Sequence, residues 1–203
     1  MAPRRRTLFD MKGQLRLSGG RKIQSPKGVL TRPTTARVRE AVMNIIGARI
    51  KGCHWLDLCS GSGVMGCEAL QRGAKRILAV EQNKNTAKIC EANLLSIAAD
   101  QSQQAYIEVN CNEVTSFLKK GYQQSPKKNG QTNSFDLVYL DPPYGSEIYS
   151  SVFKLLLEKN WLKKGSLVIC EHSSSITLDT PNQWIEQGRK MYGRNALLLI
   201  SPP

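Results

Sequence analysis

Blocks of apolar residues alternate with mixed polar segments along the chain from residue 52 onward. Five short apolar runs predict β-strands, and they cover Trp55–Cys59, Arg76–Glu81, Tyr106–Val109, Phe135–Leu140 and Ser166–Cys170. Two further segments repeat apolar residues at helical spacing, namely Ala87, Cys90, Leu94 and Ile97 within Asn83–Ile97, and Tyr149, Val152, Phe153 and Leu156. Strands that alternate with helices in this way predict a mostly parallel sheet covered by helices on both faces.

Two later segments add features to this predicted parallel sheet. Arg189–Tyr192 and Ala196–Ile200 flank Gly193-Arg194-Asn195, a pattern that predicts an antiparallel hairpin at one edge of the sheet. Lys119–Ser134 is nearly free of apolar side chains and predicts a long mobile loop, which we interpret as an insertion rather than as a substrate contact. The expected fold is therefore α/β, with a terminal antiparallel hairpin.

The segment ahead of the sheet is different in character. Ser18–Thr31 is rich in glycine and basic residues and predicts a hairpin or an arm. Thr34 or Thr35 would cap a following helix, whose apolar stripe is Val38, Ala41, Val42 and Ile45. We therefore predict a basic N-terminal arm over residues 1–31 and a single α/β domain over residues 32–203.

The positive charge of the chain is concentrated in this first part. Residues 1–51 contain 13 Lys/Arg and 2 acidic residues, which gives +11, whereas residues 52–203 contain 16 Lys/Arg and 14 acidic residues, which gives +2. Such asymmetry favours a polyanionic partner, and nucleic acid is the leading class because no membrane signal accompanies it. For Arg4–Arg6 taken alone, a solvated tail without a partner is an equally good interpretation.

Several classes of protein are not indicated by the sequence. No apolar run reaches about 18 residues, so a membrane-spanning helix is not predicted, and the N-terminal arginines lack the apolar stretch that follows them in a signal peptide. The six cysteines are scattered, with no CxxC pair and only two histidines nearby in the chain. We interpret them as free buried thiols in a reducing compartment, the cytoplasm, with no metal, while zinc ligation or disulfides remain alternatives.

The first chemical motif is the glycine-rich segment Leu56–Gly66, which reads LDLCSGSGVMG. Gly61, Gly63 and Gly66 form a GxGxxG pattern between a predicted strand and a predicted helix, and Glu81 ends the next strand 20 residues after Gly61. This spacing fits a dinucleotide-binding fingerprint, in which the acidic residue binds a ribose hydroxyl. A lone GxGxxG is weak evidence, and a purely structural glycine turn is also compatible with it.

Asp57 distinguishes between two cofactor classes. It lies four residues before Gly61 at the end of the first strand, where its carboxylate would face the space near the glycine loop. A pyrophosphate would be repelled there by about 1–4 kcal/mol. S-adenosylmethionine has no phosphate and carries an ammonium and a sulfonium, which such an acid attracts. Asp57 therefore favours a methyl donor over a dinucleotide.

The second motif, Asp141-Pro142-Pro143-Tyr144, directly follows the strand FDLVYL. Ligands of such sheets bind at the carboxyl ends of the strands. An aryl amine is a weak nucleophile. A carboxylate and a backbone carbonyl that accept hydrogen bonds from its two N–H groups would make its nitrogen more nucleophilic. Asp141 can supply the carboxylate and Pro142 the carbonyl, while the two prolines stiffen the turn. Tyr144 can stack on a base, which is worth about 1–3 kcal/mol.

These motifs together resemble a known family. Arg32–Asn44 (RPTTARVREAVMN), Leu56–Leu70 (LDLCSGSGVMGCEAL) and the DPPY loop look like the RsmD family of guanine-N2 methyltransferases of small-subunit (16S) ribosomal RNA, and the likeness runs from about Leu15 to Ile200. The resemblance implies a Rossmann-like class I methyltransferase fold with a mostly parallel seven-stranded sheet. It also implies S-adenosylmethionine as cofactor and ribosomal RNA as partner, within the small subunit or its precursor.

The resemblance also implies roles for individual residues. Asp57, Gly61 and Gly63 would hold the methionine part of the donor, Glu81 its ribose and Asn112 its adenine. Asp141 would contact both donor and acceptor. Thr35 and Arg37, in the N-terminal motif, would lie near the donor or the target nucleotide. The charge of the basic segment separately predicts that it binds phosphates around the target, and Arg21, Lys22 and Arg32 belong to this segment.

The expected mechanism is direct methyl transfer to an amine held by Asp141 and Pro142, without a metal or a covalent nucleophile. The nearest alternative is the same chemistry on adenine N6 of DNA or another RNA, since DPPY alone does not separate the two. An NAD-dependent oxidoreductase, resting on GxGxxG and Glu81, and a non-catalytic RNA-binding module are further alternatives. Nothing in the sequence demands more than a monomer.

Overall fold

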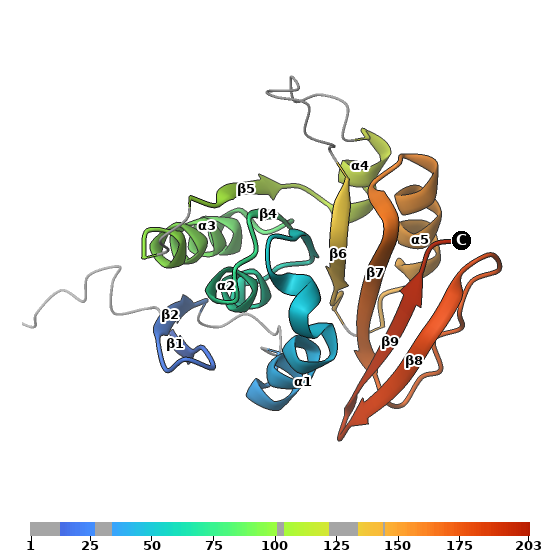
Figure 1. Cartoon of the computed structure of the whole chain (residues 1–203), viewed down its shortest axis with the longest axis horizontal. Helices are drawn as coiled ribbons and strands as arrows, with labels where there is room; N and C mark the ends of the chain where they lie inside the picture. Colours follow the sequence, from blue (N-terminus) through green and yellow to red (C-terminus); the bar gives the residue numbers. More distant parts are fainter. Residues whose placement is uncertain (1–12, 27–33, 101–103, 122–133, 144) are drawn as a thin grey trace, which may run out of the picture.

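The computed structural model describes residues 13–26, 34–100, 104–121, 134–143 and 145–203. A seven-stranded sheet has the order β5-β4-β3-β6-β7-β9-β8 (Figure 1). The strands from β3 to β7 run parallel, and β9 and β8 continue the sheet antiparallel. The strands are β3 (His54–Leu58), β4 (Arg76–Glu81), β5 (Tyr106–Cys111), β6 (Phe135–Leu140), β7 (Leu162–Ser173), β8 (Ile185–Tyr192) and β9 (Asn195–Ser201). The predicted fold class is confirmed.

Helices cover both faces of this sheet. They are α1 (Ala36–Ile46), the short 3-10 helix η2 (Gly47–Ile50), α2 (Val64–Gln71), α3 (Lys84–Ala98), α4 (Val114–Lys119) and α5 (Tyr149–Glu158). Alternate strand residues enter two apolar layers: Trp55 and Tyr139 pack with α1, α2 and α3, whereas Leu56 and Val138 pack with α4 and α5. Because both faces are buried, the central strands read as almost continuous apolar runs.

The strand order reverses between β3 and β6. The chain moves outward from β3 to β4 and β5, and then returns to place β6 on the other side of β3. In open α/β sheets, ligands bind outside the carboxyl ends of the strands at such a switch point. The two sequence motifs follow β3 and β6, and they adjoin here because Leu58 pairs with Leu140.

The N-terminal hairpin starts earlier in the chain than the sequence indicates. β1 (Gly13–Arg16) pairs antiparallel with β2 (Lys22–Ser25), so Ser18 lies in the turn rather than at the start of the hairpin. The apolar pattern misses this start because each strand has only four residues. Residues 1–12, which include Arg4–Arg6, and residues 27–31 of the predicted arm lie outside the described part. The boundary at residue 31 between arm and domain stays a prediction.

Other local predictions meet mixed outcomes. The terminal hairpin is confirmed as β8 and β9, and Thr35 caps α1 by accepting a hydrogen bond from Val38 N at 3.3 Å. The start of the predicted loop Lys119–Ser134 is the last residue of α4, and residues 122–133 lie outside the described part.

The cysteines are mostly buried, as predicted. Four of the six free cysteines are buried, but Cys111 is exposed and Cys59 is partly exposed. Among the described residues, no helix combines the length and apolar character needed to span a membrane.

Candidate active site

The glycine loop after β3 is shaped by close packing. Gly63 precedes α2 with φ +76°, and a Cβ there would lie 2.7 Å from Cys90 Sγ. At Gly66 a Cβ would lie 2.9 Å from Leu94 Cδ2, so this glycine allows α2 and α3 to approach. Gly61 also has a positive φ of +54°, but a Cβ there would meet nothing within 4 Å. The loop is therefore closely packed against α3 at Gly63 and Gly66, and it has open space beside Gly61.

Glu81 joins the ends of three neighbouring strands. Its Oε2 accepts a hydrogen bond from Gly61 N at 3.0 Å, and its Oε1 accepts one from Asn83 N at 2.8 Å. The N–H of Asn112, after β5, donates to the Glu81 carbonyl at 3.2 Å. The structure thus brings together Gly61, Glu81 and Asn112, which the family resemblance assigns to one ligand.

Asp57 lies beneath the glycine loop rather than in open space. Its side chain is 2% exposed, and its Oδ2 accepts a hydrogen bond from Gly66 N at 3.2 Å. Burial raises the pKa of Asp57 to about 7, although the Gly66 hydrogen bond opposes this. Asp57 would therefore act on a ligand mainly through its charge, and direct contact stays a prediction.

Asp141 begins the second loop and is held from two sides. Its N–H donates to the Leu58 carbonyl at 3.4 Å, and its Oδ2 accepts a hydrogen bond from Thr34 Oγ1 at 3.2 Å. Burial and the nearby Glu171 carboxylate raise the pKa of Asp141 well above its ordinary value, and Asp57 adds to the rise. Pro142 is buried and Pro143 is exposed.

Glu171 is a site residue that sequence reasoning missed. It is 4% exposed in β7, where its side chain accepts hydrogen bonds from the Tyr139 hydroxyl and from Asn195 Nδ2. Leu140 pairs with Cys170, so the next residue of each strand, Asp141 and Glu171, continues the same register. Only the pairing of β6 with β7, which the sequence alone does not specify, reveals this neighbour.

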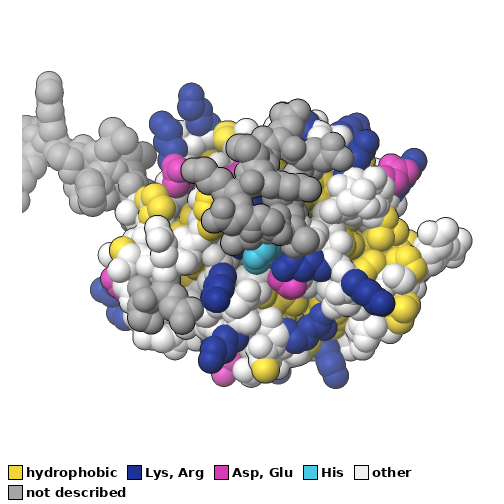
Figure 2. Space-filling view, turned by 45° about the horizontal axis from the view of Figure 1, so that its top comes forward, with side chains coloured by type: hydrophobic (Ala, Val, Ile, Leu, Met, Phe, Trp, Pro, Cys, Tyr) yellow, Lys and Arg dark blue, Asp and Glu magenta, His cyan; other side chains and the backbone are white. Residues whose placement is uncertain are grey.

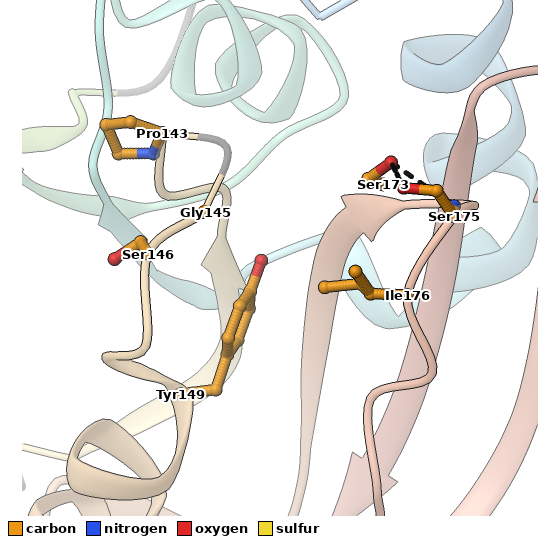
Figure 3. A pocket seen from close by; sticks show the side chains of 7 residues that line it. All are labelled: Pro143, Gly145, Ser146, Tyr149, Ser173, Ser175 and Ile176. Atoms are coloured by element: carbon orange, nitrogen blue, oxygen red, sulfur yellow. Dashed lines mark hydrogen bonds between the residues drawn. The ribbon is translucent and has the colours of Figure 1, made fainter.

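A hollow of about 280 Å³ opens beside the second loop. Figure 3 shows Pro143 and Ser146 on one side, Ser173, Ser175 and Ile176 on the other, and Tyr149 between them. Its volume is close to the lower end of small-molecule sites, which start near 300 Å³. The Tyr149 hydroxyl donates to the Glu171 carbonyl at 2.8 Å, which fixes this wall of the hollow.

The remaining predicted site residues lie in the N-terminal hairpin, in the first turn of α1 or outside the described residues. Arg37 and Lys22 are exposed, whereas Arg21 donates to the Ser96 carbonyl at 2.9 Å and forms an ion pair with Asp100, just after the C-terminal end of α3. The Arg21 guanidinium thus fastens the hairpin to α3. Arg32 and Tyr144 lie outside the described residues.

Basic side chains are not confined to the N-terminal segment on the folded surface. Figure 2 shows lysine and arginine side chains spread over one face, with fewer acidic ones among them. Beyond residue 51, the exposed cations Lys75 and Lys164 lie just before or at the start of strands of the sheet, and Arg49 and Lys51 lie ahead of β3. The near-neutral charge of residues 52–203 therefore hides an uneven distribution, since Asp57, Asp141 and Glu171 lie at the opposite ends of their strands.

Comparison with known proteins identifies the family. The family model described as "Conserved hypothetical protein 95" matches residues 13–201. A relative from Haemophilus influenzae, "Ribosomal RNA small subunit methyltransferase D", is 34% identical over 179 residues, which cover 86% of this chain and 87% of the relative. The chain belongs to the RsmD family. The resemblance inferred from RPTT, the glycine loop and DPPY is thereby confirmed.

Solved structures agree with this RsmD-family assignment. The Escherichia coli protein yhhF, described as a methyltransferase, superimposes with a TM-score of 0.75 at 27% identity, covering 93% of this chain and 97% of that one. SMU.776, solved as a complex with SAH, has a TM-score of 0.70 at 14% identity and covers 94% of this chain and 56% of that one. The latter likeness concerns the fold alone, which is that of methyltransferases that use S-adenosylmethionine.

Proposed function

We propose that this RsmD-family protein transfers a methyl group from S-adenosylmethionine to the exocyclic N2 amine of a guanine in small-subunit ribosomal RNA. The observation that carries the proposal is the position of Asp141 and Pro142. They follow β6 at the switch point of the sheet, directly beside the glycine loop after β3. The relatives named for methylation of small-subunit ribosomal RNA support the choice of substrate.

The chemistry of the site suits a cationic donor. Gly61, Glu81 and Asn112 would hold the donor, with the open space above Gly61 available to it. Asp57 and Asp141 both have pKa values raised by burial, and the nearby acids raise them further. A positively charged ligand would relieve this repulsion, whereas a pyrophosphate would increase it. When bound, S-adenosylmethionine supplies the electrophilic methyl group on its sulfonium.

Asp141 and Pro142 would orient the acceptor. The Asp141 carboxylate accepts a hydrogen bond from one N–H of the amine and the Pro142 carbonyl accepts one from the other, which aims the nitrogen lone pair at the methyl group. Catalysis then comes chiefly from positioning and electrostatics. The hollow beside Pro143 would receive the target base, and Tyr144 would stack on it. The base must be unpaired or flipped to reach this position.

The basic N-terminal part would bind the surrounding phosphates. Lys22 and Arg37 are exposed and free to face a polyanion, and Arg32 and Thr35 belong to the same segment. Such contacts give an affinity that falls steeply with salt. We further expect the RNA to be met within the small subunit or its precursor, in the cytoplasm, by a monomeric enzyme.

Asp141→Asn tests the catalytic role. Replacement of the carboxylate should lower methyl transfer to ribosomal RNA by about 100-fold or more, as expected for loss of one preorganised group at the reacting centre. Binding of S-adenosylhomocysteine, measured by calorimetry, should remain. Glu147→Gln is the matched control, because Glu147 is an exposed acid six residues later. Full activity of Asp141→Asn would overturn the proposal.

The substrate and cofactor are tested separately from the mechanism. Mass spectrometry of nucleosides from RNA treated with the protein should detect N2-methylguanosine, whereas N6-methyladenosine would support the adenine alternative. Calorimetry should show binding of S-adenosylhomocysteine and not of NAD. Tighter binding of NAD would instead favour an oxidoreductase.

A further inference from the structure

A buried chain of hydrogen bonds connects the N-terminal hairpin with Asp141. We propose that Thr34 and Arg39 are positioning residues that hold the Asp141 carboxylate in place and couple it to the hairpin. The inference rests on the proposed catalytic role of Asp141. Neither Thr34 nor Arg39 is among the residues that the motifs assign to donor or substrate.

The hairpin end of this chain centres on Glu68 in α2. The Ser18 N–H and hydroxyl both donate to Glu68 Oε1, at 2.9 and 3.0 Å, and Arg39 Nε donates to the same oxygen at 3.3 Å. Arg39 Nη2 also donates to the Arg16 carbonyl at 2.6 Å. Glu68 is 0% and Arg39 4% exposed, so the hairpin is fixed to α1 and α2 by buried charged groups.

At its other end, this chain of hydrogen bonds reaches Asp141 through Thr34. Arg39 Nη1 donates to the Thr34 carbonyl at 2.9 Å, and Thr34 Oγ1 donates to Asp141 Oδ2 at 3.2 Å. Thr34 is also held by position, since the next residue, Thr35, caps α1. One guanidinium thus binds three separate groups: the Arg16 carbonyl, the Thr34 carbonyl and the Glu68 carboxylate. Arginine suits this task because its planar donors are preorganised, whereas lysine offers a single point charge.

The arrangement fits a positioning role better than a purely stabilising one. A buried ion pair often gives no more stability than apolar residues of the same volume, because both charges lose their hydration. A carboxylate that accepts a hydrogen bond at Oδ2 keeps lone pairs for a further donor. Thr34 therefore fixes the rotamer of Asp141 while leaving it able to accept the N–H of an amine.

Removing the Thr34 hydroxyl should change the ionisation of Asp141 as well as its position. Five titratable groups interact electrostatically with Asp141. They come from β3 and the residue after it, β6, α5 and β7, and they are Asp57, Cys59, Tyr139, Tyr149 and Glu171. The Glu171 and Asp57 carboxylates raise the pKa of Asp141, whereas the hydrogen bond from Thr34 lowers it. Burial and the nearby acids raise the pKa values of Cys59, Tyr139 and Tyr149, so these three groups are neutral while Asp141 titrates. Without that bond, the acid limb of the kcat profile should move to higher pH.

Thr34→Val and Thr34→Ser form the test, since valine keeps the shape and serine keeps the hydroxyl. Relative to wild type, Thr34→Val should lower kcat for ribosomal RNA by about 10-fold and raise the acid limb by about one pH unit, the order expected for a lost hydrogen bond to a charged group. Thr34→Ser should restore both. KM for RNA should change little in either variant, because neither replaces a proposed RNA contact.

Arg39→Lys adds a second, independent measurement. It keeps the charge beside Glu68 but not the three-way contact, so kcat should fall while circular dichroism remains that of the folded protein. If Arg39→Lys does not fold, the comparison of Thr34→Val with Thr34→Ser still tests the positioning role. If Thr34→Val keeps wild-type kcat and pH profile while Asp141→Asn is inactive, the positioning role is overturned and the proposed function stands. If Asp141→Asn is itself active, the proposed function fails.

Discussion

Replacement of Asp57 by asparagine should stabilise the ligand-free protein at neutral pH. Burial raises the pKa of this carboxyl to about 7 in the folded protein, against an ordinary value of 3.8 that applies to the unfolded chain. Ionisation of Asp57 therefore favours unfolding. The stability associated with its neutral form is fully present below pH 3.8 and is lost as the pH rises to about 7.

The size of this effect follows from the difference between the two pKa values. One pKa unit corresponds to about 1.36 kcal/mol, so a rise of about three units costs about 4 kcal/mol of folding free energy at pH 8. No reduction for solvent screening is needed, because the side chain is 2% exposed. Asparagine keeps an oxygen for Gly66 N but brings an N–H₂ group that also needs partners. A net gain of about 2 kcal/mol at pH 8 is therefore the reasonable expectation.

Urea denaturation at pH 5 and pH 8 measures this directly. The difference in unfolding free energy between Asp57→Asn and wild type should increase from pH 5 to pH 8, since other titrating groups cancel in the difference. Calorimetry provides the functional counterpart: the variant should lose about 1 kcal/mol more affinity for S-adenosylmethionine than for S-adenosylhomocysteine, because only the former carries a sulfonium. A stability difference that is equal at both pH values would refute the reasoning.

Two further substitutions test the packing and the hairpin. Gly66→Ala would place a Cβ 2.9 Å from Leu94 Cδ2 and 3.2 Å from Ile77 Cγ2, so thermal denaturation should show a loss of about 1–3 kcal/mol, and an unchanged melting temperature would contradict the close packing. Arg21→Ala removes the contacts with Ser96 and Asp100, so amide exchange in β2 should accelerate while that in β9 does not.

Much of the fold is predictable because its strands are buried on both faces. The apolar runs match β4 and β6 at both ends, and the helical stripe before residue 98 matches α3 to within one residue. Elements with few apolar residues are harder. α4 is absent from the sequence-based prediction because it has six residues and starts from Glu113, whose side chain caps it. β7 extends beyond its apolar core at both ends, because pairing with β6 and β9 stabilises its polar residues.

The site was predictable only as far as it is local in sequence. Motifs of contiguous residues place Asp141 and the glycine loop correctly beside each other, since each ends a central strand. The residues that support Asp141 are remote: Thr34 lies 107 positions away, and Glu171 becomes a neighbour only through strand register. A threonine before a helix cap and an acid in a strand carry no recognisable signal of their own. The sequence also does not reveal that the Arg21 guanidinium binds Ser96 and Asp100, and its role as an RNA contact stays a prediction.

Three acidic residues are crowded beneath the site, and a cationic ligand would make this arrangement favourable. Asp57, Asp141 and Glu171 lie near the carboxyl ends of the adjacent strands β3, β6 and β7, and each of the first two has its pKa raised by burial and by an acidic neighbour. Such crowding destabilises the empty site. A cationic donor would reverse the sign of this interaction, because the same carboxylates that repel each other attract a sulfonium. Methyl transfer removes the positive charge of the sulfur, so the product keeps its ammonium but loses the attraction of the carboxylates for the sulfonium. The repulsion stored in the empty site thus favours binding of the charged donor over retention of its neutral product.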